Sequence, residues 1–368
     1  LAFIMPFEFF NTGYGEEIKK SLLEHHLLKQ ILIFENEKEI FPEATTTVCV
    51  LLCKNDGKED TIKITFIKTN EELNQISDIS NFYQRKIMPS DLPYNKKWTP
   101  IIMALFSEQK NPDDFCKLSL YGTVTRGIAT GANDFFSLTK SKIENLQLGY
   151  ENICKCITKS SQIKKAIFTD VDFDILYNAN KPIYCLDVKD HDKQEIKKYI
   201  REGEQLGYHE RYLTKTRNLW YEIEKRKPAP ILFGVFNRGR LKVVRNLTTA
   251  IYFTCFHSFY PNIFGKELVN KLFVYLLSDI GQQIIKFNKR SYGDNLDKFE
   301  PGDLNDGLCP NQTQFELIDE EAADEVINLA KIDEEAAVKL SNNLIDRIMN
   351  YRNEIKTEIL PAFPHQGR

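Results

Sequence analysis

The first 54 residues alternate short apolar runs with one amphipathic segment. The runs at 1–6, 29–34 and 47–54 are almost wholly apolar and predict strands, the first of them buried in a parallel sheet. Residues 15–26 carry apolar side chains at helical spacing among charged ones, which predicts an amphipathic helix. Strand, helix, strand and hairpin partner in this order predict an α/β fold, namely the second half of a doubly wound sheet.

Beyond this sheet the pattern changes twice. Residues 81–100 contain three prolines and mixed polarity, which predicts an extended linker after a first domain at 1–80. Residues 101–310 carry many short apolar runs broken by helical stretches, which predicts an α+β domain with Trp98 as its anchor. The remaining residues, 311–368, predict C-terminal helices.

The C-terminal helices each begin with an acidic hexapeptide. IDEEAA occurs at 318–323 and again at 332–337, and acidic residues favour the first turn of a helix. The second copy opens a long helix whose apolar stripe is expected to pack on the preceding domain, with a partner-binding helix as the alternative. The stripe consists of Leu340, Leu344, Ile348, Tyr351, Ile355 and Ile359.

Composition places the chain among ordinary globular proteins. Its 368 residues, 42% of them hydrophobic, are enough to bury a sizeable core. No apolar run approaches the length of a membrane span, and the N-terminus lacks the basic flank of a signal peptide, so neither a membrane nor a secretory protein is expected. Eight cysteines without a C-x-x-C pair, and no His pair at ligand spacing, predict reduced thiols in a cytoplasmic protein without a metal.

Charge is distributed unevenly, although the net charge is only −3. Residues 201–250 carry about 11 Lys and Arg against about 5 Asp and Glu, whereas residues 301–368 carry about 6 against about 14. A basic middle region can bind a polyanion such as nucleic acid. The alternative is a solvated basic face without a partner.

Glycines interrupt an apolar run at TVTRGIATGANDFFSLT, residues 123–139. Glycine permits positive φ and close backbone approach, and short polar side chains and exposed amides can meet phosphate oxygens. Arg126 adds a positive charge, and with Thr130, Gly131 and Asn133 it is a candidate for nucleic-acid contact. The alternative is a structural turn at which two strands cross. A phosphate-binding P-loop is disfavoured, because no Lys-Ser or Lys-Thr follows.

A second basic cluster, NRGRLKVVRN, occupies residues 237–246. Alternate residues of a strand project to one face, which would align Arg238, Arg240 and Lys242. Three cations in a row can follow a phosphate backbone, and an arginine can read guanine. With Arg245 they complete the predicted DNA-binding residues, and a solvated strand face is again the alternative.

Five segments in a fixed order carry a resemblance that covers nearly the whole chain. They are IMPFEFFNTGYGEEIKKSLLEHHLLKQILIF, IFPEATTTVCVLLCK, RGIATGANDFF, WYEIEKRKPAPILF and RSYGDNLDKFEPGDLNDGLCP. Together they resemble the C-terminal half of type II restriction–modification N6-adenine DNA methyltransferases of the gamma class, the TaqI- and PstI-like group. The resemblance implies the last strands of a Rossmann-like catalytic sheet, followed by an α+β DNA target-recognition domain.

The resemblance also implies a cofactor and a second half. In that family the N-terminal half carries the S-adenosylmethionine loop and the Asn-Pro-Pro-Tyr catalytic motif, and neither occurs in these 368 residues. The chain, which starts without Met, is therefore expected to be a fragment that is inactive alone. Its missing half would act in cis or in trans, and no cofactor-binding residue is expected here. The pattern Arg-Gly-x-x-Thr-Gly-x-Asn at 126–133 resembles a DNA-facing turn of the family.

One aromatic residue acquires a role through the resemblance. In the family, an apolar-Phe-Pro segment places an aromatic ring against the adenine that is flipped out of the duplex, and here that ring would be Phe41 of EIFPEATTT. An aromatic face recovers part of the unstacking cost of an extruded base, roughly 1–3 kcal/mol. The alternative role of Phe41 is packing at the sheet edge.

Two functions therefore follow from the sequence. The first is sequence-specific recognition of double-stranded DNA, with support of the flipped base, inside a site-specific adenine-N6 methyltransferase of a restriction–modification system. The second is a non-catalytic DNA specificity subunit that delivers a separate methylase. The first 55 residues favour the first function, because a specificity subunit has no reason to begin with strands of a doubly wound sheet.

Overall fold

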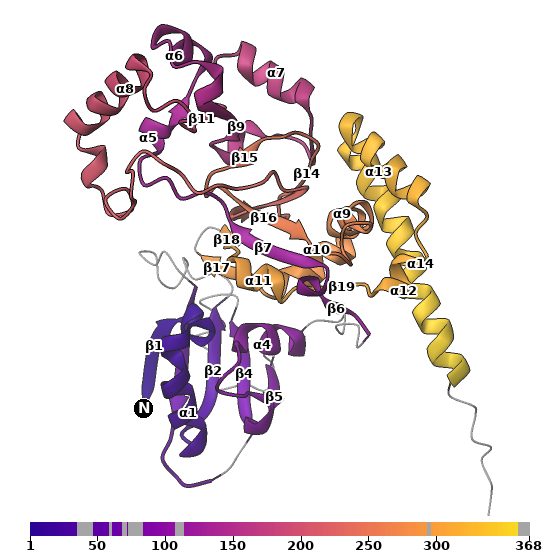
Figure 1. Cartoon of the computed structure of the whole chain (residues 1–368). Coiled ribbons are helices and arrows are strands. Elements are labelled where there is room, and N and C mark those ends of the chain that lie inside the picture. Colours follow the sequence, from indigo (N-terminus) through magenta and orange to yellow (C-terminus); the bar gives the residue numbers. More distant parts are fainter. Residues whose placement is uncertain are drawn as a thin grey trace, which may run out of the picture. The chain divides into compact units, whose positions relative to one another are not determined.

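The computed structural model describes residues 1–34, 47–58, 61–67, 72, 84–106, 114–292 and 296–359. The chain forms two compact units (Figure 1). Unit 1 comprises Leu1–Asp113, Phe236–Gly239 and Ile285–Phe299, and unit 2 comprises Asp114–Val235, Arg240–Ile284 and Glu300–Arg368. After Asp113 the chain therefore returns to unit 1 twice.

Unit 1 contains a five-stranded mixed sheet with the strand order β1-β3-β2-β4-β5. Only β2 and β4 run parallel, and the other neighbouring pairs are antiparallel. The strands expected within the first 54 residues are present, as is the helix between them. The elements are β1 (Ala2–Pro6), α1 (Glu16–Glu24), β2 (Leu28–Phe34), β3 (Val48–Cys53), β4 (Ile62–Ile67), β5 (Gln84–Ile87) and α4 (Trp98–Phe106), with a small sheet of β13 (Phe236–Arg238), β18 (Leu296–Lys298) and β17 (Arg290–Tyr292).

Strand β1 differs from the expected buried parallel strand. Within the described part of the sheet it lies at an edge and runs antiparallel to β3. Phe3 is 47% exposed and Ile4 66% exposed. An apolar run favours a strand at the edge of a sheet as well as in its centre. The run alone therefore did not distinguish the two positions.

The segment expected to be a linker contributes elements to unit 1. Strand β5 pairs with β4, and α4 begins at Trp98. The Trp98 ring is fully buried and stacks on Phe10 with 4.9 Å between ring centres, so it packs in the core of unit 1 and not in the next unit. Proline marks turns between packed elements as readily as it marks an extended linker, which is why composition was misleading here.

Unit 2 contains two larger sheets. The central sheet has the order β10-β14-β12-β16-β7 and is antiparallel except for the pair β10 and β14, and the second sheet has the order β15-β9-β11-β8. The strands are β7 (Gly122–Arg126), β8 (Ser137–Leu138), β9 (Ile153–Ile157), β10 (Ile167–Phe168), β11 (Tyr184–Leu186), β12 (Ile231–Gly234), β14 (Val243–Asn246), β15 (Ile251–Tyr252) and β16 (Phe256–Pro261), with a separate pair of β6 (Cys116–Lys117) and β19 (Leu308–Cys309).

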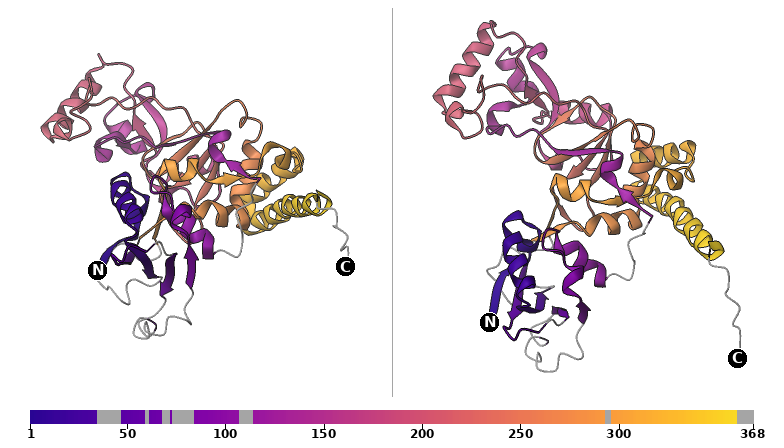
Figure 2. Two further views of the ribbon diagram at one scale, coloured as in Figure 1. Left: turned by 90° about the horizontal axis from the view of Figure 1, so that it is seen from below. Right: turned by 60° about the horizontal axis from the view of Figure 1, so that its bottom comes forward.

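Helices connect and cover these sheets. They are α5 (Asn133–Phe136), α6 (Lys140–Asn145), α7 (Asp170–Asn178), α8 (Gln194–Gln205), α9 (Val269–Leu277), α10 (Asp279–Lys286), α11 (Pro301–Asn305), α12 (Gln312–Phe315), α13 (Glu320–Ile332) and α14 (Glu334–Ile359). Helices α13 and α14 lie against each other and against α9 (Figure 2). The stripe of α14 packs as expected at Leu344 and Ile348, which are buried, whereas Tyr351 is 42% exposed.

Candidate nucleic-acid interface

The loop with the predicted DNA contacts begins where β7 ends. Within the described part of the central sheet β7 is an edge strand, and its last residue, Arg126, has an exposed side chain. Gly127 donates its N–H to Phe256 O (3.2 Å). Ile128 donates its N–H to Tyr252 O (2.8 Å). These two hydrogen bonds fix the chain on the turn between β15 and β16 as it leaves the sheet.

Thr130 and Asn133 shape the turn that follows. The Thr130 side chain is buried, and its hydroxyl donates to the side-chain oxygen of Asn133 and accepts from the N–H of Ala132 (3.1 Å). Gly131 has a φ of +74°, and a Cβ atom there would lie 2.8 Å from the Cβ atom of Leu213. Glycine is the residue that adopts this conformation at little cost. Thr130 and Gly131 therefore have structural roles in the turn, whereas the side chain of Asn133 is exposed.

The loop forms one surface hollow of about 480 Å³ together with a second arginine, Arg211. Arg211 follows α8 in the chain and donates to Gly131 O (3.4 Å), and its guanidinium lies 4.5 Å from the centre of the Tyr208 ring. All four residues predicted in the loop line this hollow. The lining consists of Arg126, Ala129, Thr130, Gly131, Asn133, Asp134, Arg211, Leu213 and Thr254.

Arg211 is the functional candidate that the sequence did not single out. It belongs to the basic region 201–250, so the charge excess of that region was a signal for it. It lies 80 residues after Gly131, however, and no local pattern relates positions so far apart. Only the packing of the chain after α8 against the loop brings the two arginines of the hollow together.

Two further arginines from the chain after α8 bind the loop and the strand that precedes it. Arg217 donates to Ala129 O (2.7 Å), and burial lowers the pKa of its guanidinium. Arg226 donates to Thr125 Oγ1 (3.1 Å) and forms an ion pair with Glu224 (2.7 Å). A loop that is already ordered loses little conformational entropy on binding a ligand. The exposed groups of the hollow are therefore positioned in advance.

The second basic cluster is not one strand, so the prediction that Arg238, Arg240 and Lys242 share a strand face is wrong. Strand β13 ends at Arg238 and β14 begins at Val243. Gly239 lies between them with a φ of +81°, and the chain turns there. Alternation of side chains holds only within a continuous strand, and the turn ends it.

Two of these cations bind protein groups. The guanidinium of Arg240 forms an ion pair with Asp279. The ammonium group of Lys242 donates to Ser160 O (2.7 Å) and to Ile163 O. Burial lowers the pKa of Lys242, because its charged form is removed from water. Lys242 therefore links the connection between β13 and β14 to the loop after β9, and Arg240 links the same connection to α10.

Arg245 is held in a similar way. Its guanidinium donates to Asn270 Oδ1 (3.0 Å) and to Pro230 O (3.2 Å), and burial lowers its pKa. Arg238, in contrast, has an exposed side chain at the end of β13 in unit 1. The four predicted residues of this cluster are thus distributed over different elements and different surroundings.

Replacing Lys242 by methionine should lower the free energy of unfolding by about 2 kcal/mol, because two hydrogen bonds from a charged group to carbonyl oxygens are lost. Chemical denaturation of the full chain measures this change. Lys215→Met removes an exposed lysine from the same unit and is expected to change stability by less than about 0.5 kcal/mol. Equal stabilities of the two variants would contradict a structural role for Lys242.

Three other expectations concern features outside this site. Phe41 lies outside the described residues. Among the described residues, no group of three or more His, Cys, Asp or Glu side chains is arranged to hold a metal ion. Within the same part of the chain, no helix combines the length and apolar character needed to cross a bilayer.

The arginine-lined hollow lies in a part of the chain that matches a known protein family. Residues 95–352 match the family model described as "Type II methyltransferase M.Eco57I, C-terminal domain". The chain belongs to this family of type II methyltransferases, and the resemblance found in the sequence is confirmed. The match includes every predicted DNA-binding residue and excludes the first strands of unit 1.

Two curated relatives agree with the family. The chain is 33% identical to the type II methyltransferase M.AccI of Acinetobacter calcoaceticus over 97% of this chain and 66% of the relative. It is 20% identical to the type II methyltransferase M.XamI of Xanthomonas campestris pv. amaranthicola over 82% of this chain and 55% of the relative. The chain thus spans less than two thirds of the length of either relative.

One solved structure shares the fold. The type IIL restriction-modification enzyme MmeI, solved in complex with DNA, is similar over 98% of this chain and 47% of that chain, with a TM-score of 0.55 and 13% sequence identity. At this identity the similarity shows a common fold. It agrees with the mixed α/β fold described above.

Proposed function

We propose that this chain provides sequence-specific recognition of double-stranded DNA for an adenine-N6 DNA methyltransferase of a restriction–modification system. In this proposal the methyl donor is S-adenosylmethionine, bound by sequence outside these residues together with an Asn-Pro-Pro-Tyr motif, in cis or in trans. We assign no residue of this chain to the cofactor. The chain alone would be inactive, and the enzyme would work in the cytoplasm.

The observation that carries the proposal is the gathering of Arg126, Asn133 and Arg211 around one hollow within the region that matches the family. Arginine side chains and backbone amides are among the groups that contact DNA phosphates, and arginine also reads guanine in the major groove. Thr130 and Gly131 would contribute through the backbone of the turn. The presence of DNA in the structure of MmeI supports the same partner for this chain.

The other predicted residues differ in how free they are to contact DNA. Phe41 is our proposed stacking partner for the flipped adenine. Arg238 is exposed and available for a phosphate contact. Arg240, Lys242 and Arg245 already bind protein groups, which favours a supporting role for them beside any contact with DNA. The family and both curated relatives are methyltransferases, which does not favour a non-catalytic specificity subunit.

Replacing Arg126 or Arg211 by alanine is expected to weaken duplex binding and to flatten its salt dependence. For each lost phosphate contact, the slope of log affinity against log salt concentration should fall in magnitude by about one unit. An arginine that reads guanine should in addition cost about 1–3 kcal/mol on the cognate duplex alone. The measurement is a titration of the full chain with cognate and scrambled duplexes at several salt concentrations.

Arg201→Ala is the matched control for this titration. It removes the same charge from an exposed position on α8 in the same unit, where Arg201 donates only to Lys197 O (3.4 Å) among the described residues. Its slope should equal that of the wild type. If the Arg126 and Arg211 variants also keep the wild-type slope and affinity, the hollow does not bind DNA and the proposal fails.

A further inference from the structure

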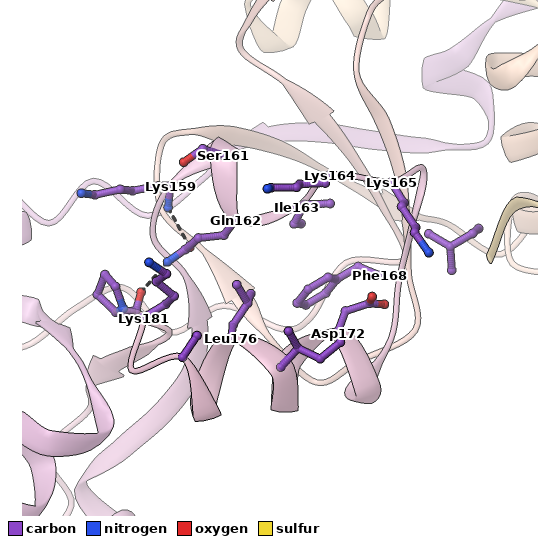
Figure 3. Close-up of a pocket in the computed structure, with 14 residues that line it drawn as sticks. Lys159, Ser161, Gln162, Ile163, Lys164, Lys165, Phe168, Asp172, Leu176 and Lys181 are labelled. Atoms are coloured by element: carbon purple, nitrogen blue, oxygen red, sulfur yellow. Dashed lines mark hydrogen bonds between the residues drawn. The ribbon is translucent and has the colours of Figure 1, made fainter. Parts of the chain in front are cut away.

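A second and larger hollow, of about 840 Å³, lies elsewhere on unit 2 (Figure 3). One side is the loop 159–165 after β9, and the opposite side is α7. Lys159 and Lys181 lie at one end and Lys165 at the other, with Lys164 along the loop side. The size is within the range of pockets that bind small ligands, and no lining residue is shared with the Arg126 hollow.

The lining of this hollow is apolar between its two sides. Ile163 of the loop and Phe168 of strand β10 are buried. Leu176 is half-buried on α7, and Ile175, one residue earlier, is 61% exposed. A flat apolar group could therefore lie against Ile175 and Leu176 and remove their exposed surface from water, which is favourable.

Lysines surround this apolar lining, and most of them have no counter-charge. Among the described residues, the ammonium groups of Lys159, Lys164 and Lys181 make no hydrogen bond or ion pair. The one carboxylate of the lining, Asp172, is occupied at the start of α7, where it accepts from the N–H of Thr169 (2.9 Å) and from its hydroxyl (2.6 Å). The hollow therefore has an excess of positive charge.

The loop that carries the lysines is held in place from two directions. Gln162 donates to Pro182 O (2.8 Å) and accepts from the N–H groups of Thr158 (2.9 Å) and Lys159 (3.0 Å). The Lys242 ammonium group donates to Ser160 O (2.7 Å). Like charges on a fixed loop repel one another, and a bound anion relieves that repulsion. The fixed loop thus favours an anionic ligand.

We propose that this hollow binds a nucleotide, with its phosphate at Lys159, Lys164 and Lys181 and its base against Ile175 and Leu176. Lysine ammonium groups bind phosphate as point charges, and apolar side chains accept the face of any base. Two sources supply this chemistry, namely an unpaired nucleotide of a DNA strand and a free nucleotide. This site is separate from the Arg126 hollow, and nucleotide binding here does not depend on duplex binding there.

Calorimetric titration of the full chain with thymidine 5′-monophosphate, inorganic phosphate and a short oligothymidylate tests this proposal. The mononucleotide should bind more tightly than inorganic phosphate. The triple variant Lys159→Gln, Lys164→Gln and Lys181→Gln should weaken mononucleotide binding about tenfold or more, since all three charges near the phosphate are lost. Ile175→Gln, at an exposed position, should weaken binding of the mononucleotide and leave that of inorganic phosphate unchanged.

The matched control removes three lysines of the same unit that do not line this hollow. Lys189→Gln, Lys193→Gln and Lys197→Gln break ion pairs with Asp187, Glu151 and Asp192, and this variant should bind the mononucleotide as the wild type does. If the hollow triple variant melts at a lower temperature than the wild type, the single variant Lys164→Gln replaces it, with a smaller loss of affinity expected.

These titrations distinguish a DNA strand from a free nucleotide as the ligand, and they distinguish this hollow from the Arg126 hollow. Displacement of the mononucleotide by oligothymidylate identifies a DNA strand as the source, and failure to displace it identifies a free nucleotide. Mononucleotide binding no tighter than that of inorganic phosphate, or an equal loss in the control, overturns the proposal. The variant that lacks Lys159, Lys164 and Lys181 should bind a blunt duplex with the affinity of the wild type. Duplex binding and mononucleotide binding are therefore tested separately, and the result for the Arg126 variant does not decide whether this hollow binds a nucleotide.

Discussion

Replacing Gly127 by alanine is expected to lower the free energy of unfolding of unit 2 by roughly 3–5 kcal/mol. An added Cβ atom would lie 2.2 Å from Phe253 O and 2.6 Å from Phe256 O. Both oxygens belong to the backbone, so no side-chain rotation relieves the overlap. The chain would have to separate from the turn between β15 and β16, and the hydrogen bonds of Gly127 and Ile128 would be lost.

Gly302→Ala is the matched control for this glycine. Gly302 lies in α11 of the same unit, and a Cβ atom there would have no heavy atom within 4 Å. Alanine favours the helix by up to about 1 kcal/mol, so this variant should be as stable as the wild type or slightly more stable. Urea denaturation of both variants decides the matter, and a Gly127 variant as stable as the control would show that the backbone approach is not required.

Replacing Asn246 by alanine is expected to lower the free energy of unfolding of unit 2 by roughly 2–4 kcal/mol. The Asn246 amide donates to Ala229 O (3.2 Å), Thr248 O (3.0 Å) and the Tyr252 hydroxyl (2.6 Å). Its oxygen accepts from the N–H (3.1 Å) and the hydroxyl (2.8 Å) of Thr248. Alanine would remove all five of these hydrogen bonds from a buried cluster, and a buried polar group that loses its partner costs about 1–3 kcal/mol.

Burial raises the pKa of Tyr252, so its neutral hydroxyl remains a donor to Ala229 O (2.9 Å), and the loss in the variant falls on the hydrogen bonds between Asn246 and Thr248. Asn218→Ala, at an exposed position of the same unit, should change stability by less than about 0.5 kcal/mol. The comparison is made by urea denaturation of the two variants and the wild type. A difference below about 1 kcal/mol between the two variants would show that water or rearranged neighbours replace the Asn246 amide.

The local sequence pattern was sufficient to predict those structural features that depend on residues close together in the chain. The amphipathic spacing at 15–26 predicted α1, and the acidic hexapeptides predicted the starts of α13 and α14. Capping, helical spacing and strand propensity act over a few residues, so a single sequence contains their signal. The glycine loop at 126–133 was also found this way, because its turn residues determine its backbone locally.

The sequence by itself therefore determined the family, the first strand, helix, strand and strand of the N-terminal sheet along the chain, and the loop that contains Arg126 and Asn133. Only the tertiary structure decided that Arg211 completes the hollow and that Lys242 is bound to carbonyl oxygens of the loop after β9. It also placed Trp98 in the core of unit 1. These contacts join residues far apart in the chain, and their free energy depends on burial and partners, which local spacing does not specify.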